Sequence, residues 1–149
     1  MKTRILIVDD HADMRKGLAE SLRKNTDLDV VGEAEDGHQA VKLVDELAPD
    51  IVIMDVVMPG LNGIEATRLI KEKHPEVEVV GLSVYPDRRF ATEMLEAGAL
   101  GYVLKNEAFQ ALVDAIHAAK AGKTYLSPGV AEARATRSLR TGRRKKGRT

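Results

Sequence analysis

Five polar or charged side chains that could take part in phosphate or metal chemistry directly follow apolar segments. Asp9 and Asp10 follow ILIV, Asp55 follows IVIM, Ser83 follows VVGL and Lys105 follows YVL. Two carboxylates about 4 Å apart repel by roughly 4 kcal/mol at an effective dielectric of 20, so three acids in one cleft need a counter-charge. Mg²⁺ suits that role, because it prefers oxygen ligands and keeps several waters.

Asp55 is the predicted nucleophile of this group. Once a cation is bound, a carboxylate can attack phosphorus. Phosphoryl transfer mainly needs positioning and charge neutralisation by a metal, a cation and a hydroxyl, and Lys105 and Ser83 would provide the last two. Pro59 and Gly60 then shape a loop that leaves the Asp55 carboxylate accessible.

The elements that must position these side chains alternate between strand-like and helical patterns. Met14, Leu18 and Leu22, for example, repeat every fourth residue, as in a helix with one apolar face. Apolar runs recur roughly every 25 residues, the spacing of strand–helix units in a parallel sheet. These runs cover residues 5–8, 30–31, 51–54, 77–82 and 102–104.

The predicted fold is therefore α/β: a doubly wound, flavodoxin-like parallel sheet of five strands in the order 2-1-3-4-5, with five flanking helices. The second strand contains Gly32 and is more polar, which suits an edge. Right-handed crossovers place every strand's carboxyl end at one edge of the sheet. We therefore expect the three acids, the hydroxyl and the lysine to converge there.

The segments ILIVDDH, DIVIMDVVMPGLNGIEATRLI, GLSVY and GYVLK closely resemble the receiver domain of bacterial two-component response regulators, over residues 3–127. The resemblance implies that Asp55 accepts a phosphoryl group from the phosphohistidine of a sensor histidine kinase. It also implies a Mg²⁺ site, with Mn²⁺ as an alternative ion. Its ligands would be Asp10, Asp55 and the backbone carbonyl of Val57, with Asp9 acting through a water.

Three further roles follow from the same resemblance. Lys105 would pair with a phosphoryl oxygen, Ser83 would be the switch hydroxyl, and Tyr102 would be the aromatic residue whose rotamer follows it. The alternatives are a Ser83 that only forms a turn and a Tyr102 that packs with its hydroxyl in water. The chain would be a signalling switch rather than an enzyme, apart from Mg²⁺-dependent self-phosphorylation from small donors and self-dephosphorylation.

Residues 33–71 and 96–128 look like the receivers of NarL/FixJ/LuxR-type regulators, which carry a C-terminal helix-turn-helix DNA-binding domain. The resemblance implies homodimerisation on phosphorylation and control of transcription. Nothing after Pro128 has the length of that domain. We interpret residues 1–127 as the receiver and 128–149 as a basic linker or tail that precedes a DNA-binding domain absent from this chain. A natural single-domain regulator acting through protein contacts is the second interpretation.

The charge distribution separates the tail from the body. Residues 131–149 hold eight Lys or Arg and one acid (net +7), which leaves 15 basic and 22 acidic residues in 1–130 (net −7). A flexible linker is the favoured interpretation, beside a nonspecific nucleic-acid contact or a cloning remnant. A sixth helix over residues 129–140 is not predicted, because its apolar face is thin.

Composition and single positions exclude several other classes. There is no cysteine, hence no disulfide or thiolate metal site, and no apolar run approaches a membrane span, so a soluble cytoplasmic protein is expected. His38, His74 and His117 are expected at the surface. His11 is expected to be an exposed neighbour of a helix cap rather than a ligand.

Three rival functions compete with the switch. A phosphohydrolase of the haloacid-dehalogenase type would need an acid where Val57 stands, and a flavodoxin would need a Ser/Thr/Gly loop where DDHADM stands. A phosphorylation-independent, receiver-like scaffold stays open. Many receivers have proline after the lysine, with a cis bond; Asn106 follows Lys105 here, so no cis bond is assumed.

Overall fold

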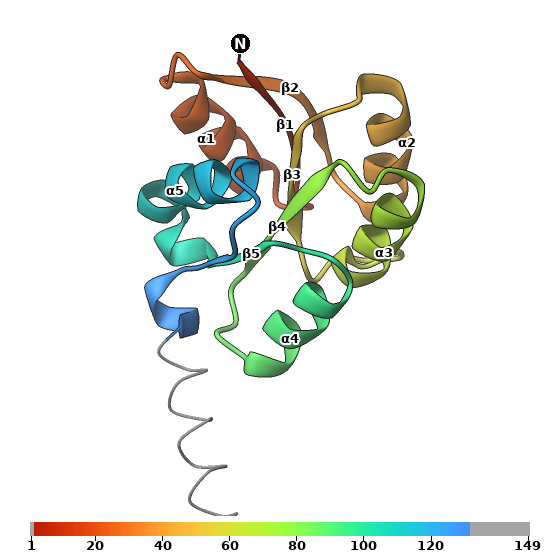
Figure 1. Cartoon of the computed structure of the whole chain (residues 1–149), viewed down its shortest axis with the longest axis vertical. Coiled ribbons are helices and arrows are strands. Elements are labelled where there is room, and N and C mark those ends of the chain that lie inside the picture. Colours follow the sequence, from red (N-terminus) through yellow and green to blue (C-terminus); the bar gives the residue numbers. More distant parts are fainter. Residues whose placement is uncertain (1, 132–149) are drawn as a thin grey trace, which may run out of the picture.

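Six parallel strands form one sheet in the order β2-β1-β3-β4-β5-β6 (Figure 1). The structure, a computed structural model, describes residues 2–131. The strands are β1 (Thr3–Val8), β2 (Leu28–Ala34), β3 (Ile51–Asp55), β4 (Glu78–Ser83), β5 (Gly101–Leu104) and β6 (Tyr125–Leu126). The predicted order of the first five strands is confirmed, and β6 is an addition that the sequence pattern did not predict.

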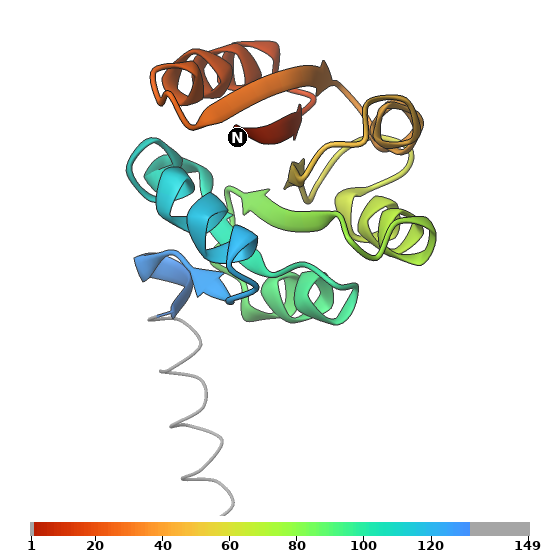
Figure 2. The ribbon, with the colours of Figure 1, turned by 45° about the horizontal axis from the view of Figure 1, so that its top comes forward.

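Helices cover both faces of this sheet. They are α1 (Ala12–Arg23), α2 (Gly37–Leu47), α3 (Gly63–Lys73), α4 (Arg88–Glu96) and α5 (Ala108–Lys120), with a 3-10 turn η1 (Lys105–Glu107) after β5. Helices α1 and α5 lie on one face and α2, α3 and α4 on the other (Figures 1 and 2). The predicted doubly wound α/β architecture is therefore confirmed.

The central strand β3 shows why its sequence is apolar without interruption. Ile51 and Ile53 enter the core under α1 and α5, whereas Val52 and Met54 enter the core under α2, α3 and α4. All four side chains are fully buried. Successive strand residues point to opposite faces, so a strand covered on both faces needs apolar residues at every position.

The chain after α5 returns to the sheet. Strand β6 pairs in parallel with β5, the Ser127 amide donates to the Tyr102 carbonyl (3.1 Å), and the Leu104 amide donates to Ser127 Oγ (3.0 Å). A helical turn begins at Pro128, and Val130 is fully buried in the core beside Tyr102 and Leu104. We call residues 125–131 the C-terminal segment.

The remaining sequence predictions for the C-terminus have a mixed outcome. The turn from Pro128 to Ala131 occupies the start of the sixth helix that was not predicted. The rest of that helix and the basic tail lie outside the described residues. No helix within residues 2–131 is long and apolar enough to span a membrane.

Candidate functional site

The carboxyl ends of β1, β3 and β5 bring acids and a lysine together. Asp9 directly follows β1, Asp55 ends β3, and Lys105 directly follows β5. Ligand atoms of Asp9, Asp10, His11 and Asp55 all lie within 4.8 Å of one another. We call these four residues and Lys105 the acidic cluster; it lies at the sheet edge where the topology predicted convergence.

Lys105 is the counter-charge inside this cluster. Its side chain is buried, and Nζ lies 3.0 Å from Asp9 Oδ2, 3.2 Å from Asp9 Oδ1, 3.2 Å from Asp55 Oδ2 and 3.3 Å from His11 Nδ1. An ammonium has three protons to donate, so four acceptors share them. The lysine alone therefore cannot satisfy the buried carboxylates.

Two carboxylate oxygens show that deficit directly. Within residues 2–131, Asp10 Oδ1 is buried without a hydrogen-bond donor, and Asp9 Oδ2 has no partner beyond the shared Lys105 Nζ, which lies 3.0 Å away. Buried polar atoms are normally paired. Incompletely paired carboxylate oxygens within a few ångströms of a third acid are the donor set that a hard cation such as Mg²⁺ takes, so the residues present fit such an ion.

The environment of Asp55 also disfavours its charged form. Burial raises the pKa of this carboxyl to about 8, helped by the charge of Asp9 and a hydrogen bond with Asp10, while Lys105 opposes the shift. This environment therefore favours the protonated form of Asp55 when no ion is bound. A divalent cation among these acids favours the carboxylate, so proton and cation compete for Asp55.

The loop after Asp55 is fixed by glycine. The Gly63 amide donates to the Val56 carbonyl (2.9 Å), and a Cβ at Gly63 would clash with the Asp55 carbonyl. Gly60 has a φ of 74°, in the left-handed region that favours glycine. Val57, whose carbonyl is the expected third ligand, lies in this loop with a half-exposed side chain. The backbone of the expected nucleophile is thus held by an approach that only glycine allows.

Ser83 and Tyr102 form a second buried group, around the β4–α4 loop. Ser83 Oγ accepts from the Tyr85 amide (3.0 Å), and the Tyr102 hydroxyl donates to the Tyr85 carbonyl (3.3 Å). Burial raises the pKa of Tyr102 to about 12, against the effect of a hydrogen bond with Ser83. The hydroxyl of Tyr102 is therefore inside the protein rather than in water, and Ser83 does stabilise a turn.

The structure does not join Ser83 to the acidic cluster. Among the hydrogen bonds of the described chain, none links its hydroxyl to Asp55 or Lys105. Of the five predicted side chains, four lie together and the fifth bonds within the adjacent loop. The Lys105–Asn106 peptide is trans, since residues 2–131 contain no cis bond.

His11 and Arg15 contact Asp9 in ways that the sequence did not predict. His11 is exposed, as expected, but it is itself the N-cap residue of α1, and its Nδ1 lies 3.2 Å from Asp9 Oδ1 and 3.3 Å from Asp10 Oδ1. Arg15 Nη1 donates to the Asp9 carbonyl at 2.6 Å. The sequence signal was the helical spacing: Arg15 is four residues after His11 and therefore on the same face.

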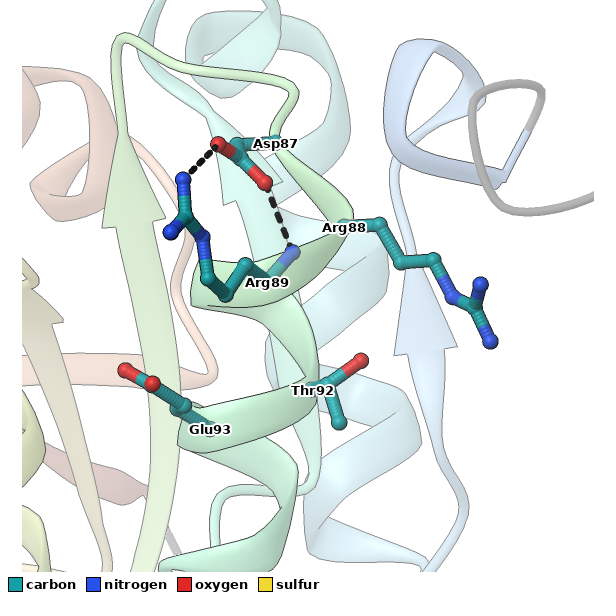
Figure 3. Close-up of a pocket in the computed structure, with 5 residues that line it drawn as sticks. All are labelled: Asp87, Arg88, Arg89, Thr92 and Glu93. Carbon is teal, nitrogen blue, oxygen red and sulfur yellow. Dashed lines mark hydrogen bonds and ion pairs between the residues drawn. The ribbon is translucent and has the colours of Figure 1, made fainter. Parts of the chain in front are cut away.

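Two hollows differ in their relation to this site. One, of about 650 Å³, is lined by the start of α1 (residues 11–14), Val84, Lys105 and Asn106, and opens the acidic cluster to solvent. The other, of about 610 Å³, lies on α4, where Asp87 caps the Arg89 amide (2.7 Å) and pairs with its side chain (3.6 Å) (Figure 3). None of the residues that line the second hollow belongs to the acidic cluster.

Comparisons with known proteins agree with this architecture. Residues 5–117 match the family described as the response regulator receiver domain. Response regulator GacA of Pseudomonas viridiflava is 42% identical over 136 residues, which cover 91% of this chain and 64% of GacA. Transcriptional regulatory protein LiaR of Bacillus subtilis is 41% identical over 128 residues, covering 86% and 61%. The chain thus spans less than two-thirds of the length of these relatives.

Solved structures give the same result. A LuxR-family two-component response regulator from Aurantimonas sp. SI85-9A1 superposes with a TM-score of 0.89 at 37% identity, covering 93% of this chain and 99% of that one. The isolated receiver domain of RcsB from Salmonella enterica serovar Typhimurium, solved with the phosphomimetic BeF₃⁻, gives 0.81 at 27% identity, covering 89% and 98%. The family match, the identity to curated relatives and these superpositions show that the chain belongs to the receiver domains of two-component response regulators.

Proposed function

We propose that this chain is a Mg²⁺-dependent phosphoacceptor switch in which Asp55 receives a phosphoryl group from a sensor histidine kinase. The observation that carries the proposal is the acidic cluster itself: Asp55 ends the central strand within reach of Asp9, Asp10 and Lys105, and this one lysine does not satisfy all the buried carboxylate oxygens. A structural role alone would not favour three acids gathered around a single lysine.

The cation would be held by Asp10, Asp55 and the Val57 carbonyl, with Asp9 acting through a water; Mn²⁺ suits the same oxygens. When bound, it supplies positive charge to the oxygens of the phosphoryl group. Asp9 is already bonded to the His11 amide (2.9 Å) and to Lys105 (3.2 Å), so it is better placed to orient a water than to move towards an ion.

Asp55 performs the chemical step. It loses its proton to solvent, its carboxylate oxygen forms a bond to phosphorus, and the bond from phosphorus to the histidine nitrogen of the donor breaks; that nitrogen keeps the electron pair and takes a proton from solvent. Lys105 Nζ, which lies 3.2 Å from Asp55 Oδ2, then donates to a phosphoryl oxygen. Attack of water on the same phosphorus would return Asp55 and release phosphate, which is the limited self-dephosphorylation expected of a switch.

The new charge on Asp55 changes the conformation of the β4–α4 loop. Phosphorylation adds about −1.5 to −2 charges at pH 7, and Ser83 Oγ turns from the Tyr85 amide to a phosphoryl oxygen. Tyr102 is already buried under the loop, so Val84 and Tyr85, which are 60% and 50% exposed, are the residues that move. A change from 1:99 to 99:1 needs about 5.5 kcal/mol of differential interaction, which several charge-assisted hydrogen bonds can supply.

The output would be a changed surface over α4, β5 and α5. We propose that it leads to homodimerisation and, in a longer protein, to control of a C-terminal DNA-binding domain. Curated relatives that are called transcriptional regulatory proteins, such as LiaR, support this output. So does RcsB, whose dimers have been solved bound to DNA. Residues 128–149 remain the proposed linker, with its first four residues docked against the sheet.

Intact mass spectrometry tests the proposal. The parent chain and Asp55→Asn are incubated with acetyl phosphate and Mg²⁺, and in parallel with EDTA. We expect the parent to gain one phosphoryl group only with Mg²⁺, and the variant to gain none. A folded parent that gains nothing at saturating Mg²⁺ would instead indicate a phosphorylation-independent scaffold.

A further inference from the structure

We infer that Arg15 is a positioning residue for the cation site, which it controls through the backbone of Asp9 rather than through a carboxylate. The inference deepens the proposed function and rests on it. Arg15 lies in the first turns of α1, with a side chain only 13% exposed. Nothing in the phosphoacceptor chemistry described above requires it.

The contacts of Arg15 join three elements. Nη1 donates to the Asp9 carbonyl (2.6 Å), and Nε donates to Glu33 Oε1 on β2 (3.1 Å). On the other side of the same residue, the Asp9 amide donates to the Ala34 carbonyl (3.0 Å). The peptide groups around Asp9 are thus held from α1 and from β2 at once.

The position of Asp9 explains why this support is needed. The ladders of β1 with β2 and β3 both end at Val8, paired with Ala34 and Met54, so the Asp9 carbonyl lies beyond the sheet. Asp9 is nevertheless fully buried. A buried carbonyl outside regular structure needs a donor from elsewhere, and the Arg15 guanidinium supplies it. Asp10, the expected direct ligand, is attached to this carbonyl.

Glu33 determines the kind of role that Arg15 plays. Because Arg15 is paired with Glu33, its charge is largely neutralised, and its role is to hold the backbone of Asp9 in position. Lys105, by contrast, contacts the carboxylates themselves. Arg23 offers a natural comparison on the same helix. Its Nη2 lies 4.0 Å from Glu33 Oε2 and its side chain is half exposed, so it shares the acidic partner but makes no described contact with Asp9.

Loss of the hydrogen bond from Arg15 to the Asp9 carbonyl should weaken cation binding. Groups that orient the ligands of a metal typically cost 10–100-fold in affinity when mutated. Arg15→Met should therefore weaken Mg²⁺ binding about tenfold. Arg15→Lys, which can donate to the Asp9 carbonyl but not hold Glu33 at the same time, should lose about threefold, an intermediate loss on the same scale.

The experiment measures two quantities for the parent, Arg15→Met, Arg15→Lys and Arg23→Met. Mg²⁺ affinity is measured by isothermal titration calorimetry. Amide hydrogen exchange of residues 9–11 is measured without Mg²⁺, because this readout reports the position of the turn directly. We expect faster exchange at the Asp9 and His11 amides in Arg15→Met, together with the tenfold loss of affinity, and neither change in Arg23→Met.

Each outcome is decisive. Mg²⁺ binding by Arg15→Met within twofold of the parent would overturn the inference and leave the proposed function intact, as would an equal loss in Arg23→Met, which would indicate charge alone. Should Arg15→Met not fold, Arg15→Lys with unchanged affinity and exchange would overturn the inference. A parent that binds no Mg²⁺ would overturn the proposed function together with this inference.

Discussion

The acidic cluster and the contact between β5 and the C-terminal segment differ strongly in how far their polar groups are paired. In the cluster, Asp10 Oδ1 is buried without a hydrogen-bond donor within the described chain, and burial raises the pKa of Asp55 to about 8. On β5, the Tyr102 carbonyl and the Leu104 amide both bond to Ser127.

The difference indicates that the acidic cluster is the region that changes state and that the β5 contact is the region that keeps a fixed structure. Unpaired buried polar groups and shifted pKa values concentrate at functional sites, where a bound ion or group completes them. A fully paired edge gains nothing from a ligand and loses free energy if it opens. Substitutions in the acidic cluster should therefore respond to Mg²⁺ or to pH, whereas a substitution at the β5 contact should leave Mg²⁺ binding unchanged.

The largest effect is expected from Lys105→Met. Removing one partner of a buried ion pair leaves an uncompensated charge on Asp9 and costs about 3–5 kcal/mol of unfolding free energy. Urea unfolding measures this loss, and saturating Mg²⁺ should restore much of it by replacing the counter-charge. Lys16→Met, which removes an exposed lysine from α1, is the matched control. A loss no greater than that of the control would show that the cluster does not need a cation.

A pH dependence is expected from Asp55→Asn. Between about pH 4 and 8 the folded parent keeps a proton on Asp55 that the unfolded chain releases near its ordinary pKa of 3.8. The unfolded state therefore binds fewer protons, and the parent loses stability as pH rises through this window. Without Mg²⁺, Asp55→Asn should be more stable than the parent by about 1–3 kcal/mol at pH 8 and equal to it at pH 4.

Urea unfolding in EDTA at the two pH values checks this expectation. Asp114→Asn, an exposed acid on α5, should differ from the parent equally at both. A stability difference between the parent and Asp55→Asn that stays the same at pH 4 and pH 8 would mean that Asp55 is ionised in the ion-free protein, contrary to the environment described.

The smallest effect is expected at the contact between β5 and the C-terminal segment. Ser127→Ala leaves the buried Leu104 amide without its acceptor and should lower the unfolding free energy by about 1–2 kcal/mol. Because the loss lies on β5 rather than in the cluster, Mg²⁺ affinity measured by calorimetry should stay unchanged. Thr124→Ala, at an exposed position, should alter neither quantity. A Ser127→Ala variant with weakened Mg²⁺ binding would show that the β5 contact and the acidic cluster are energetically coupled.

The same contrast explains what could be predicted from the sequence. The alternation of apolar runs with helical patterns predicted a doubly wound parallel sheet. In such a sheet the carboxyl ends of all strands share one edge, which is where Asp9, Asp55 and Lys105 meet. The direction of the Ser83 hydroxyl could not be predicted from the sequence. It depends on which hydrogen-bond partner is closer, and in the structure that partner is the Tyr85 amide.

The residues that were missed share a physical cause. Arg15 reaches the Asp9 carbonyl only because α1 begins at Ala12, and a shift of the helix start by one residue would turn its side chain by about 100°. Strand β6 has two residues, too few for any periodicity. Both depend on three-dimensional placement rather than on a pattern along the chain.

The C-terminal segment has a further consequence for the sheet. Without it, β5 would be an open edge, with the carbonyls of Leu100 and Tyr102 and the amide of Leu104 unpaired, whereas they now bond to Tyr125 and Ser127. Open edges pair with strands of other molecules and lead to aggregation. Residues 125–131 therefore also protect this edge from pairing with other copies of the chain, and a version shortened to residue 124 would lose solubility while its acidic cluster remained intact.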